Sequence, residues 1–166
     1  MNEYIEYIVE KKKSMKDVFK CAFTVGFAFL FIWPLLFIPM YPMLKTVLIV
    51  GIVYGASKIV GSVNVEFEYI ITDNEMDIDK IVNKKSRKRL VTVNLRRTEE
   101  YGKCNGEAEK RYLNNSEYRV IEARSDRGGK NNSYLTYKSD EGKGILLFTP
   151  GEKIEEKINE TMKYRF

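Results

Sequence analysis

Residues 21–44, CAFTVGFAFLFIWPLLFIPMYPML, contain no formally charged side chain, and seven of them are Phe, Trp or Tyr. After a single Lys45, the apolar sequence continues as TVLIVGIVYGAS, residues 46–57. A helix that crosses the ~30 Å hydrocarbon core of a bilayer needs roughly 20 apolar residues, and this block is about twice that length. The stretch therefore predicts two membrane-crossing helices.

Two prolines mark the break between these helices. Pro39 and Pro42 each lack a backbone donor and disfavour helical geometry in the residue before them. The sequence thus predicts a helical hairpin, with helices at residues 18–38 and 43–60. Tyr41 lies in the predicted turn, where an amphipathic ring suits the headgroup boundary.

Two other arrangements of this block remain open. A buried core hairpin of a soluble protein would need a polar side on each helix, and neither helix has one. A re-entrant hairpin stays possible because the second stretch is short and contains three glycines. Gly51, Gly55 and Ala56 place small side chains on one side, which would allow the two helices to approach closely.

Lysines flank the hairpin on both sides, and the connecting turn carries only Lys45. Because cytoplasmic flanks are enriched in Lys and Arg, this pattern predicts a two-span protein of the cell membrane with both termini in the cytoplasm. The lysines before the first helix are Lys11, Lys12, Lys13, Lys16 and Lys20, and Lys58 ends the second.

The rest of the chain is polar enough to be a soluble domain. The 166 residues include 28 basic and 23 acidic side chains, for a net charge of +5, and the mean hydropathy is −0.34 despite the apolar block. Roughly 100 residues after the hairpin suffice for one hydrophobic core. Cys21 and Cys104 lie in a helix and a probable loop, which makes a structural disulfide implausible and suits a reducing compartment.

These patterns divide the chain into three parts. Residues 1–17 form a cytosolic juxtamembrane amphipathic segment, residues 18–60 the transmembrane hairpin, and residues 63–166 a cytosolic β-rich domain. Within the first part, the apolar residues at positions 4, 5, 8 and 9 have helical spacing. We therefore expect a short amphipathic helix over residues 1–10 that lies on the membrane surface.

After the hairpin, the spacing of apolar residues changes from continuous apolar runs to alternation with polar residues. Alternating apolar and polar residues predict strands at 63–71, 76–81 and 90–95, joined by turns at Asp73-Asn74 and at residues 83–86. Residues 98–115 suggest a loop with one short element. Further strands are expected at 117–123, 133–138 and 144–148.

The chain ends with an amphipathic helix that begins at Glu152, because Ile154, Ile158 and Met162 recur at helical spacing. Six or seven antiparallel strands closed by one helix give an α+β fold, either an antiparallel sheet or a small barrel, after the transmembrane hairpin.

The strand order, the corner Phe148-Thr149-Pro150 and the C-terminal helix resemble bacterial pleckstrin-homology-like (PH-like) domains attached to a membrane hairpin. The segment NVEFEYIITDNEMDIDKI, residues 64–81, followed by the basic NKKSRKRL, residues 83–90, is similar to an uncharacterised bacterial family of small two-span membrane proteins. The resemblance implies a fold and a location, and it carries over no catalytic residue.

The sequence offers no catalytic or metal constellation. The chain contains no histidine, and Cys104 therefore has no histidine partner. Asp73, Glu75, Asp77 and Asp79 form an acidic cluster, but alternation along a strand favours a solvated edge over a metal site. The glycines at 128–129 and 142–144 lack the context of a phosphate-binding loop. We expect no enzyme activity, no cofactor and no metal.

The candidate functional surface is a basic run around the turn between the second and third predicted strands. At roughly 1 kcal/mol per cation near an anionic leaflet, half of these side chains would press this edge onto the membrane. A solvated turn that only obeys the positive-inside bias is the alternative. The predicted contacts with anionic lipid are Lys84, Lys85, Arg87, Lys88 and Arg89.

Three functional hypotheses remain for this sequence, and one of them, an enzyme, has no constellation of residues to support it. The first is a membrane-anchored, non-catalytic module whose β domain binds an anionic lipid surface or a protein partner. The second is an accessory or scaffold subunit that packs against a larger membrane complex through its hairpin. Nucleic acid is not an expected partner, because exposed aromatic residues do not alternate with the cations.

Overall fold

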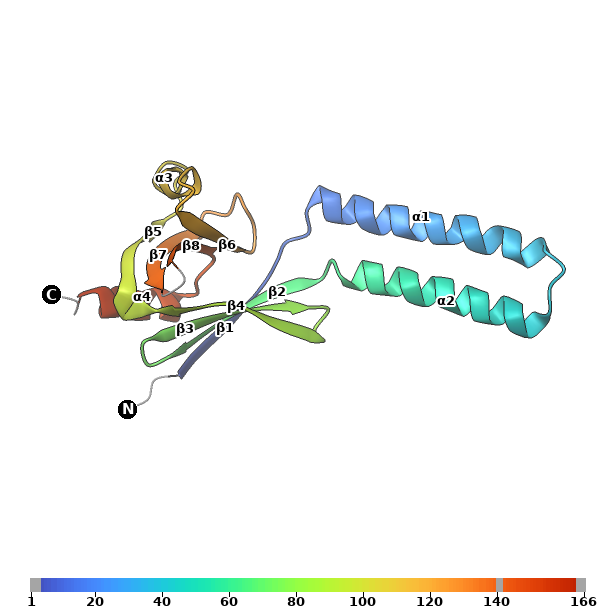
Figure 1. The fold of residues 1–166 in the computed structure, drawn as a ribbon, viewed down its shortest axis with the longest axis horizontal. Coiled ribbons are helices and arrows are strands. Elements are labelled where there is room, and N and C mark those ends of the chain that lie inside the picture. The colour runs from blue at the N-terminus through green and yellow to red at the C-terminus, as the bar shows by residue number, and fades with distance from the viewer. Residues whose placement is uncertain (1–3, 140–141, 164–166) are drawn as a thin grey trace. The chain divides into compact units, whose positions relative to one another are not determined.

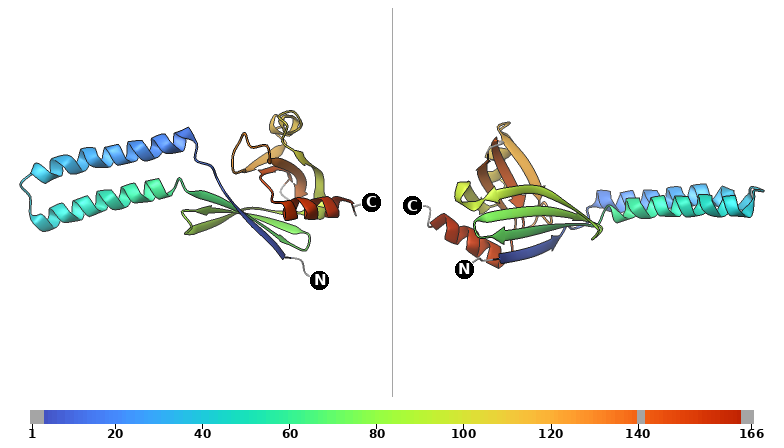
Figure 2. Two further views of the ribbon diagram at one scale, coloured as in Figure 1. Left: turned by 180° about the vertical axis from the view of Figure 1, so that it is seen from behind. Right: turned by 60° about the horizontal axis from the view of Figure 1, so that its bottom comes forward.

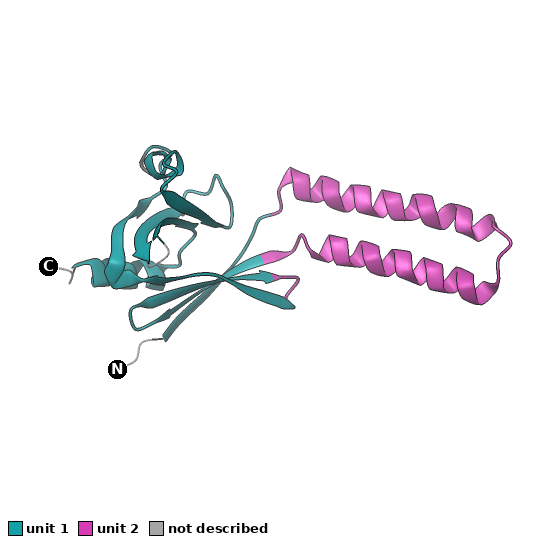
Figure 3. Ribbon diagram, viewed as in Figure 1, with its two compact units in different colours: residues 1–12, 66–81, 85–166 teal, residues 13–65, 82–84 magenta. Residues whose placement is uncertain are grey.

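A computed structural model of the chain describes residues 4–139 and 142–163. The chain divides into two compact units, coloured separately in Figure 3. Unit 1 comprises residues 1–12, 66–81 and 85–166 and contains most of the β structure. Unit 2 comprises residues 13–65 and 82–84 and contains two long helices.

The two helices of unit 2 are α1 (Met15–Phe37) and α2 (Pro42–Gly61), as the sequence predicts. The carboxylate of Asp17 accepts a hydrogen bond from the Ser14 N–H at 3.0 Å, which satisfies a free donor at the start of α1. Pro42 occupies the first turn of α2, where its missing N–H costs nothing. At 1.5 Å per residue the helices are roughly 34 and 30 Å long, enough to cross a bilayer.

The apolar side chains of both helices are exposed. Among the described residues of α1 none is buried, and in α2 only Gly61 is. The rest of the described chain therefore does not cover these helices, in contrast to the core hairpin of a soluble protein. The close approach that the small residues would allow does not occur at Gly51 or Gly55, since a Cβ added at either position would meet nothing within 4 Å.

Unit 1 is built on two four-stranded sheets, with strand orders β1-β2-β3-β4 and β5-β7-β8-β6 (Figures 1 and 2). The first sheet consists of β1 (Tyr4–Glu10), β2 (Val65–Thr72), β3 (Glu75–Val82) and β4 (Ser86–Asn94). The second consists of β5 (Thr98–Lys103), β6 (Tyr118–Ala123), β7 (Ser133–Ser139) and β8 (Gly142–Phe148). The other elements are η1 (Leu95–Arg97), α3 (Ala108–Leu113) and α4 (Glu152–Lys163).

The helix expected in the first ten residues is wrong where the structure describes them. Residues 4–10 form β1, which pairs antiparallel with β2 from Tyr4 opposite Thr72 to Glu10 opposite Glu66; residues 1–3 lie outside the described chain. The segment YIEYIVE is rich in β-branched and aromatic residues, which favour strands. Pairing with a strand more than fifty residues away in the sequence decides its structure.

The second sheet corrects two further expectations. The sheet is not wholly antiparallel, because β6 pairs parallel to β8 while β7 pairs antiparallel to it. The β7–β8 pair places β8 between β7 and the earlier strand β6. Residues 98–115 hold two elements, β5 and α3, where one short element was expected. The described strands form two sheets and no closed barrel.

The main core lies between the sheets. Tyr69 from β2 and Phe148 from β8 are fully buried and meet edge to face, with ring centroids 5.7 Å apart. Ile154 and Ile158 of α4 are also buried, as their spacing predicts. The other face of the second sheet carries a smaller cluster, in which Tyr134, Ile145 and Leu147 contact the partly buried residues Cys104, Tyr112 and Tyr118.

One glycine in β8 makes room for a core aromatic ring. Gly144 lies opposite Tyr137 of β7, and a Cβ at this position would be 2.4 Å from the Tyr137 Cζ. Gly144→Ala should therefore lower stability by about 1–3 kcal/mol, the usual cost of overpacking. The measurement is the melting temperature of the full chain in detergent. Unfolding is detected by the reaction of a thiol dye with half-buried Cys104, in a protein that also carries Cys21→Ser.

Gly128→Ala is the matched control, because a Cβ there would meet nothing within 4 Å. Equal melting temperatures for the two variants would contradict the packing argument.

Candidate functional site

The basic run surrounds the tight turn between β3 and β4. Asn83 and Lys84 have positive φ angles of 53° and 54°, the left-handed backbone geometry that is common in tight hairpin turns. The Asn83 N–H donates to the Asn64 carbonyl at 2.7 Å, and the Asn83 side chain lies against Gly61, the last residue of α2. Residues 82–84 of this turn therefore belong to unit 2, and Asn83 and Lys84 lie at the end of α2.

The net charge of the chain is concentrated in unit 2. This unit holds six lysines and one acidic residue, Asp17, so it carries the whole formal charge of +5 while the charges of unit 1 balance. Only Lys45 lies near the connecting turn of the helices, where its ammonium donates to the Leu36 carbonyl at 3.4 Å. The opposite end of the helix pair carries Lys13, Lys16, Lys20, Lys58 and Lys84.

The first arginine of the run is paired with a buried carboxylate. The Arg87 Nη2 donates to Glu68 Oε1 of β2 at 3.0 Å. The side chain of Glu68 is only 2% exposed, whereas that of Arg87 is 56% exposed. Arg87 therefore compensates the charge of a carboxylate that is buried away from water.

The second arginine, Arg89, binds two carboxylates of β3. Its Nε donates to Asp79, and its Nη1 lies 2.5 Å from Asp77 Oδ1. Thr92 donates to the same Asp77 oxygen at 2.6 Å. Asp79 is buried, so the carboxylates expected at a solvated edge are instead the partners of an arginine on the neighbouring strand.

Burial raises the pKa of Glu68 above its ordinary value. Arg87 opposes this rise, while the nearby carboxylates Glu6 and Asp79 add to it. Among the described atoms, Glu68 Oε2 has no hydrogen-bond partner. Among these groups, only the Arg87 guanidinium lowers the pKa of Glu68 and so favours its charged form.

The five predicted contact residues are therefore not equivalent. The structure brings them together on one hairpin, but Arg87 and Arg89 are engaged with carboxylates of β2 and β3. Lys84, Lys85 and Lys88 are exposed. The sequence analysis did not identify Glu68 and Asp79 as partners of Arg87 and Arg89. The signal that could have found them is the presence of acidic residues on the predicted strands next to the one that carries these arginines.

Two observations outside the basic turn concern metal binding and thiol reactivity. No group of three or more Cys, Asp or Glu side chains in the described part of the chain is arranged to hold a metal ion. Burial raises the pKa of Cys104 to about 11, which leaves its thiol almost entirely protonated at neutral pH. Glu100 accepts hydrogen bonds from the hydroxyls of Tyr112 and Tyr134 and joins α3 to the second sheet.

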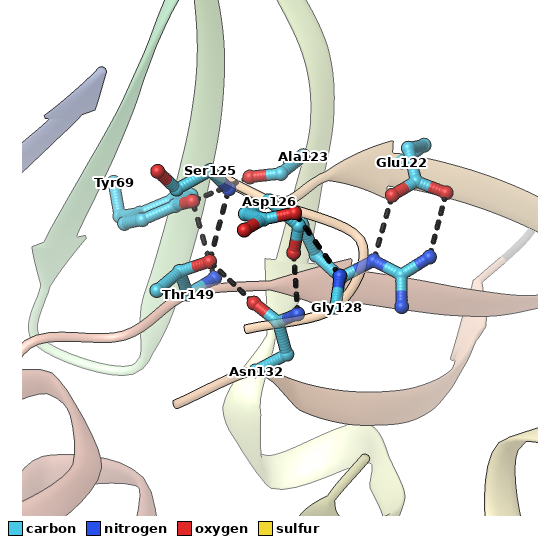
Figure 4. Close-up of polar contacts among 9 residues, drawn as sticks. Tyr69, Glu122, Ala123, Ser125, Asp126, Gly128, Asn132 and Thr149 are labelled. Atoms are coloured by element: carbon cyan, nitrogen blue, oxygen red, sulfur yellow. Dashed lines mark hydrogen bonds and ion pairs between the residues drawn. The ribbon is translucent and has the colours of Figure 1, made fainter. Parts of the chain in front are cut away.

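A buried polar network holds the loop that follows β6 (Figure 4). The Thr149 hydroxyl donates to Asn132 Oδ1 at 2.8 Å and accepts from the Ser125 N–H at 3.0 Å. The Tyr69 hydroxyl donates to the Ala123 carbonyl at 2.5 Å.

The same loop holds the end of β1. The Ser125 hydroxyl donates to the Glu10 carbonyl at 2.6 Å, and the Lys12 N–H donates to the Ser125 carbonyl at 2.8 Å. The backbone that leads from β1 toward α1 is thus fixed up to residue 12 by hydrogen bonds to the loop.

The sequence profile of one family, described as "Bacterial PH-like domain (DUF6106)", matches residues 1–166, the whole chain. No curated protein and no solved structure gives a significant match. The match confirms the fold that the sequence resemblance implies, and the structure adds that the helical hairpin lies between the first and second strands of the domain.

The Glu68–Arg87 pair predicts a pH-dependent effect of mutation. An acid whose pKa is higher in the folded state binds more protons when folded, so its contribution to stability falls as pH rises from the unfolded pKa through the folded pKa. Arg87→Ala removes the opposing charge and raises the folded pKa of Glu68 further. The variant should lose about 1–3 kcal/mol at pH 7 and less at pH 5.

Thermal unfolding of the full chain at the two pH values measures this difference, and Lys85→Ala is the exposed control. An equal loss for Arg87→Ala at pH 5 and pH 7 would show that Glu68 does not depend on Arg87.

Proposed function

We propose, from the premise that this chain belongs to the bacterial PH-like domain family, that it is a membrane-anchored, non-catalytic module that contacts an anionic lipid surface. Helices α1 and α2 are the anchor, and the turn between β3 and β4 makes the contact through Lys84, Lys85 and Lys88. Arg87 and Arg89 add donors at the same edge, with charges largely balanced by their carboxylate partners.

One observation carries this proposal: the basic turn lies at the end of α2. If α2 crosses the bilayer, its end at Gly61 reaches the headgroup region, and Lys84 is placed there with it. Lys20 at the same end donates to the Ser62 hydroxyl at 3.1 Å. Lysines at this level favour anionic headgroups on the cytoplasmic side.

The energy available from this contact is sufficient to orient a tethered domain. At about 1 kcal/mol per cation near an anionic leaflet, three lysines contribute about 3 kcal/mol. The tether already supplies the membrane localisation, so this energy acts only on orientation. Only residues 11–14 and 62–64 separate the strands from the helices, which gives the domain two short connections in place of one.

The second candidate, an accessory subunit, is favoured by the open glycine positions in α2. Space remains beside Gly51 and Gly55, and small residues at i and i+4 permit close approach of another helix. In that case a protein partner in the membrane would cover the exposed apolar side chains of the hairpin.

Reversing the three exposed lysines tests the lipid contact. A fluorophore on Ser86→Cys, in a protein with Cys21→Ala and Cys104→Ala, reports proximity to lipids that carry a headgroup quencher. In nanodiscs that contain phosphatidylserine we expect stronger quenching than in phosphatidylcholine discs, and Lys84→Glu, Lys85→Glu and Lys88→Glu together should remove the difference. Arg87 and Arg89 stay unchanged because reversing them would disturb the buried carboxylates.

Lys110, Lys130 and Lys163, which are exposed elsewhere, provide the matched triple reversal to Glu. Raising the salt from about 0.1 to 1 M shortens the Debye length from roughly 10 to 3 Å and should weaken the anionic preference. Identical quenching in anionic and neutral discs would refute the contact.

The proposed orientation is tested by cysteine labelling in intact cells. Tyr41 is 84% exposed in the turn between the helices, so Tyr41→Cys in the same cysteine-free protein should react with an impermeant maleimide from outside. Ser86→Cys should react only after permeabilisation. Labelling of position 86 in intact cells would place the β domain outside.

A further inference from the structure

Strand β1 is one edge of the first sheet (Figures 1 and 2). Proteins usually shield edge strands with Lys, Pro, bulges or a covering segment. The opposite edge, β4, carries three consecutive cations at 87–89, and β5 shows a register shift between Thr98 and Glu100. The segment Tyr4–Glu10 has no Lys, Arg, Pro or Gly and pairs with β2 without a shift.

The outer side of β1 has no other strand beside it in the described chain. Among the described residues, no backbone hydrogen bond joins residues 4–10 to a strand other than β2, and the Glu10 carbonyl at the end of β1 accepts from the Ser125 hydroxyl. The free N–H and C=O groups of an edge strand are a template for another extended chain.

A cavity of 430 Å³ runs along this edge, within the size range of ligand pockets. One wall is formed by three successive β1 residues, Ile5, Glu6 and Tyr7, and the other by residues 150–154 at the start of α4. Successive strand residues point to opposite faces, so a cavity that touches all three lies at the strand edge and not on one face. The Tyr7 ring lies against Gly151 and holds the two walls together.

The chemistry of β1 alternates across its two faces. Ile5 and Tyr7 lie opposite Ile71 and Tyr69, on the face that is buried in the core. Glu6 and Glu10 point to the other face, which also carries Tyr4 and Ile8, and all four of these residues are exposed. An added strand would continue the pleat, with apolar residues beside Ile5 and Tyr7 and residues of opposite charge beside the glutamates.

We propose that β1 is a strand-addition site for an extended segment of another polypeptide in which apolar and basic residues alternate. Main-chain hydrogen bonds to the free edge supply affinity, and the groove beside α4 together with the two glutamates supplies specificity. This site is separate from the basic turn, so its occupancy does not depend on lipid contact.

The test uses the full-length protein in phosphatidylcholine nanodiscs and a fluorescent synthetic peptide, as long as β1, that alternates valine and lysine. We expect saturable binding by fluorescence anisotropy and slower amide hydrogen exchange in residues 4–10. A peptide with the same side chains but N-methylated backbone amides should not bind, because it cannot join the sheet. A valine–glutamate peptide should bind roughly tenfold more weakly.

Charge reversal supplies the decisive comparison. Glu6→Lys with Glu10→Lys should reverse the preference between the two peptides, whereas the control Glu107→Lys with Glu156→Lys, at exposed positions outside the groove, should not. Circular dichroism verifies that both variants fold. Equal binding of the N-methylated peptide, an unchanged preference after reversal, or a stable dimer that excludes the peptide would each overturn the proposal.

Discussion

The antiparallel pairing of β1 with β2 is the constraint on which the rest of the molecule depends. Because Glu10 lies opposite Glu66, the chain leaves the sheet and returns to it at neighbouring positions. The apolar helices are therefore an insertion in the domain and not a tail that precedes it. Such an insertion is tolerated because two antiparallel helices bring their own ends together, and the entropy cost of closing a loop grows slowly with length.

The same sheet determines what the basic run can do. Arg87 and Arg89 lie beside Glu68 and Asp79, two carboxylates that are buried on neighbouring strands. Removing either arginine would leave a carboxylate charge with little access to water. The main role of these two arginines is therefore to stabilise the sheet, and contact with a membrane is secondary. A count of cations in the sequence therefore overstates the charge that the turn offers to a membrane.

The helices and strands whose structure follows from the pattern of apolar residues alone could be predicted from the sequence. The apolar block gave both helices, and the apolar run in β8 and the spacing of Ile154 and Ile158 gave the central strand and the last helix. Residues 4–10 fit either a strand or a helix until their partner β2 is known. The parallel β6–β8 pair depends on which strands become neighbours in the sheet, which the local sequence pattern does not reveal. The cations of the site were visible in the sequence, but their carboxylate partners lie on other strands.

Charge segregation explains how a domain with balanced charge could still prefer one orientation at a membrane. The charges of unit 1, which includes Lys85 and Lys88, cancel overall, so a long-range attraction to an anionic surface would act mainly on unit 2. At physiological salt the Debye length is about 8 Å, so only cations close to the headgroups contribute. Lys84 follows β3 in the sequence, but it is grouped with the helices in unit 2 and lies near the end of α2. Arg87 and Arg89 join β4 to β2 and β3 through their carboxylate partners. The turn between β3 and β4 then positions the lysines.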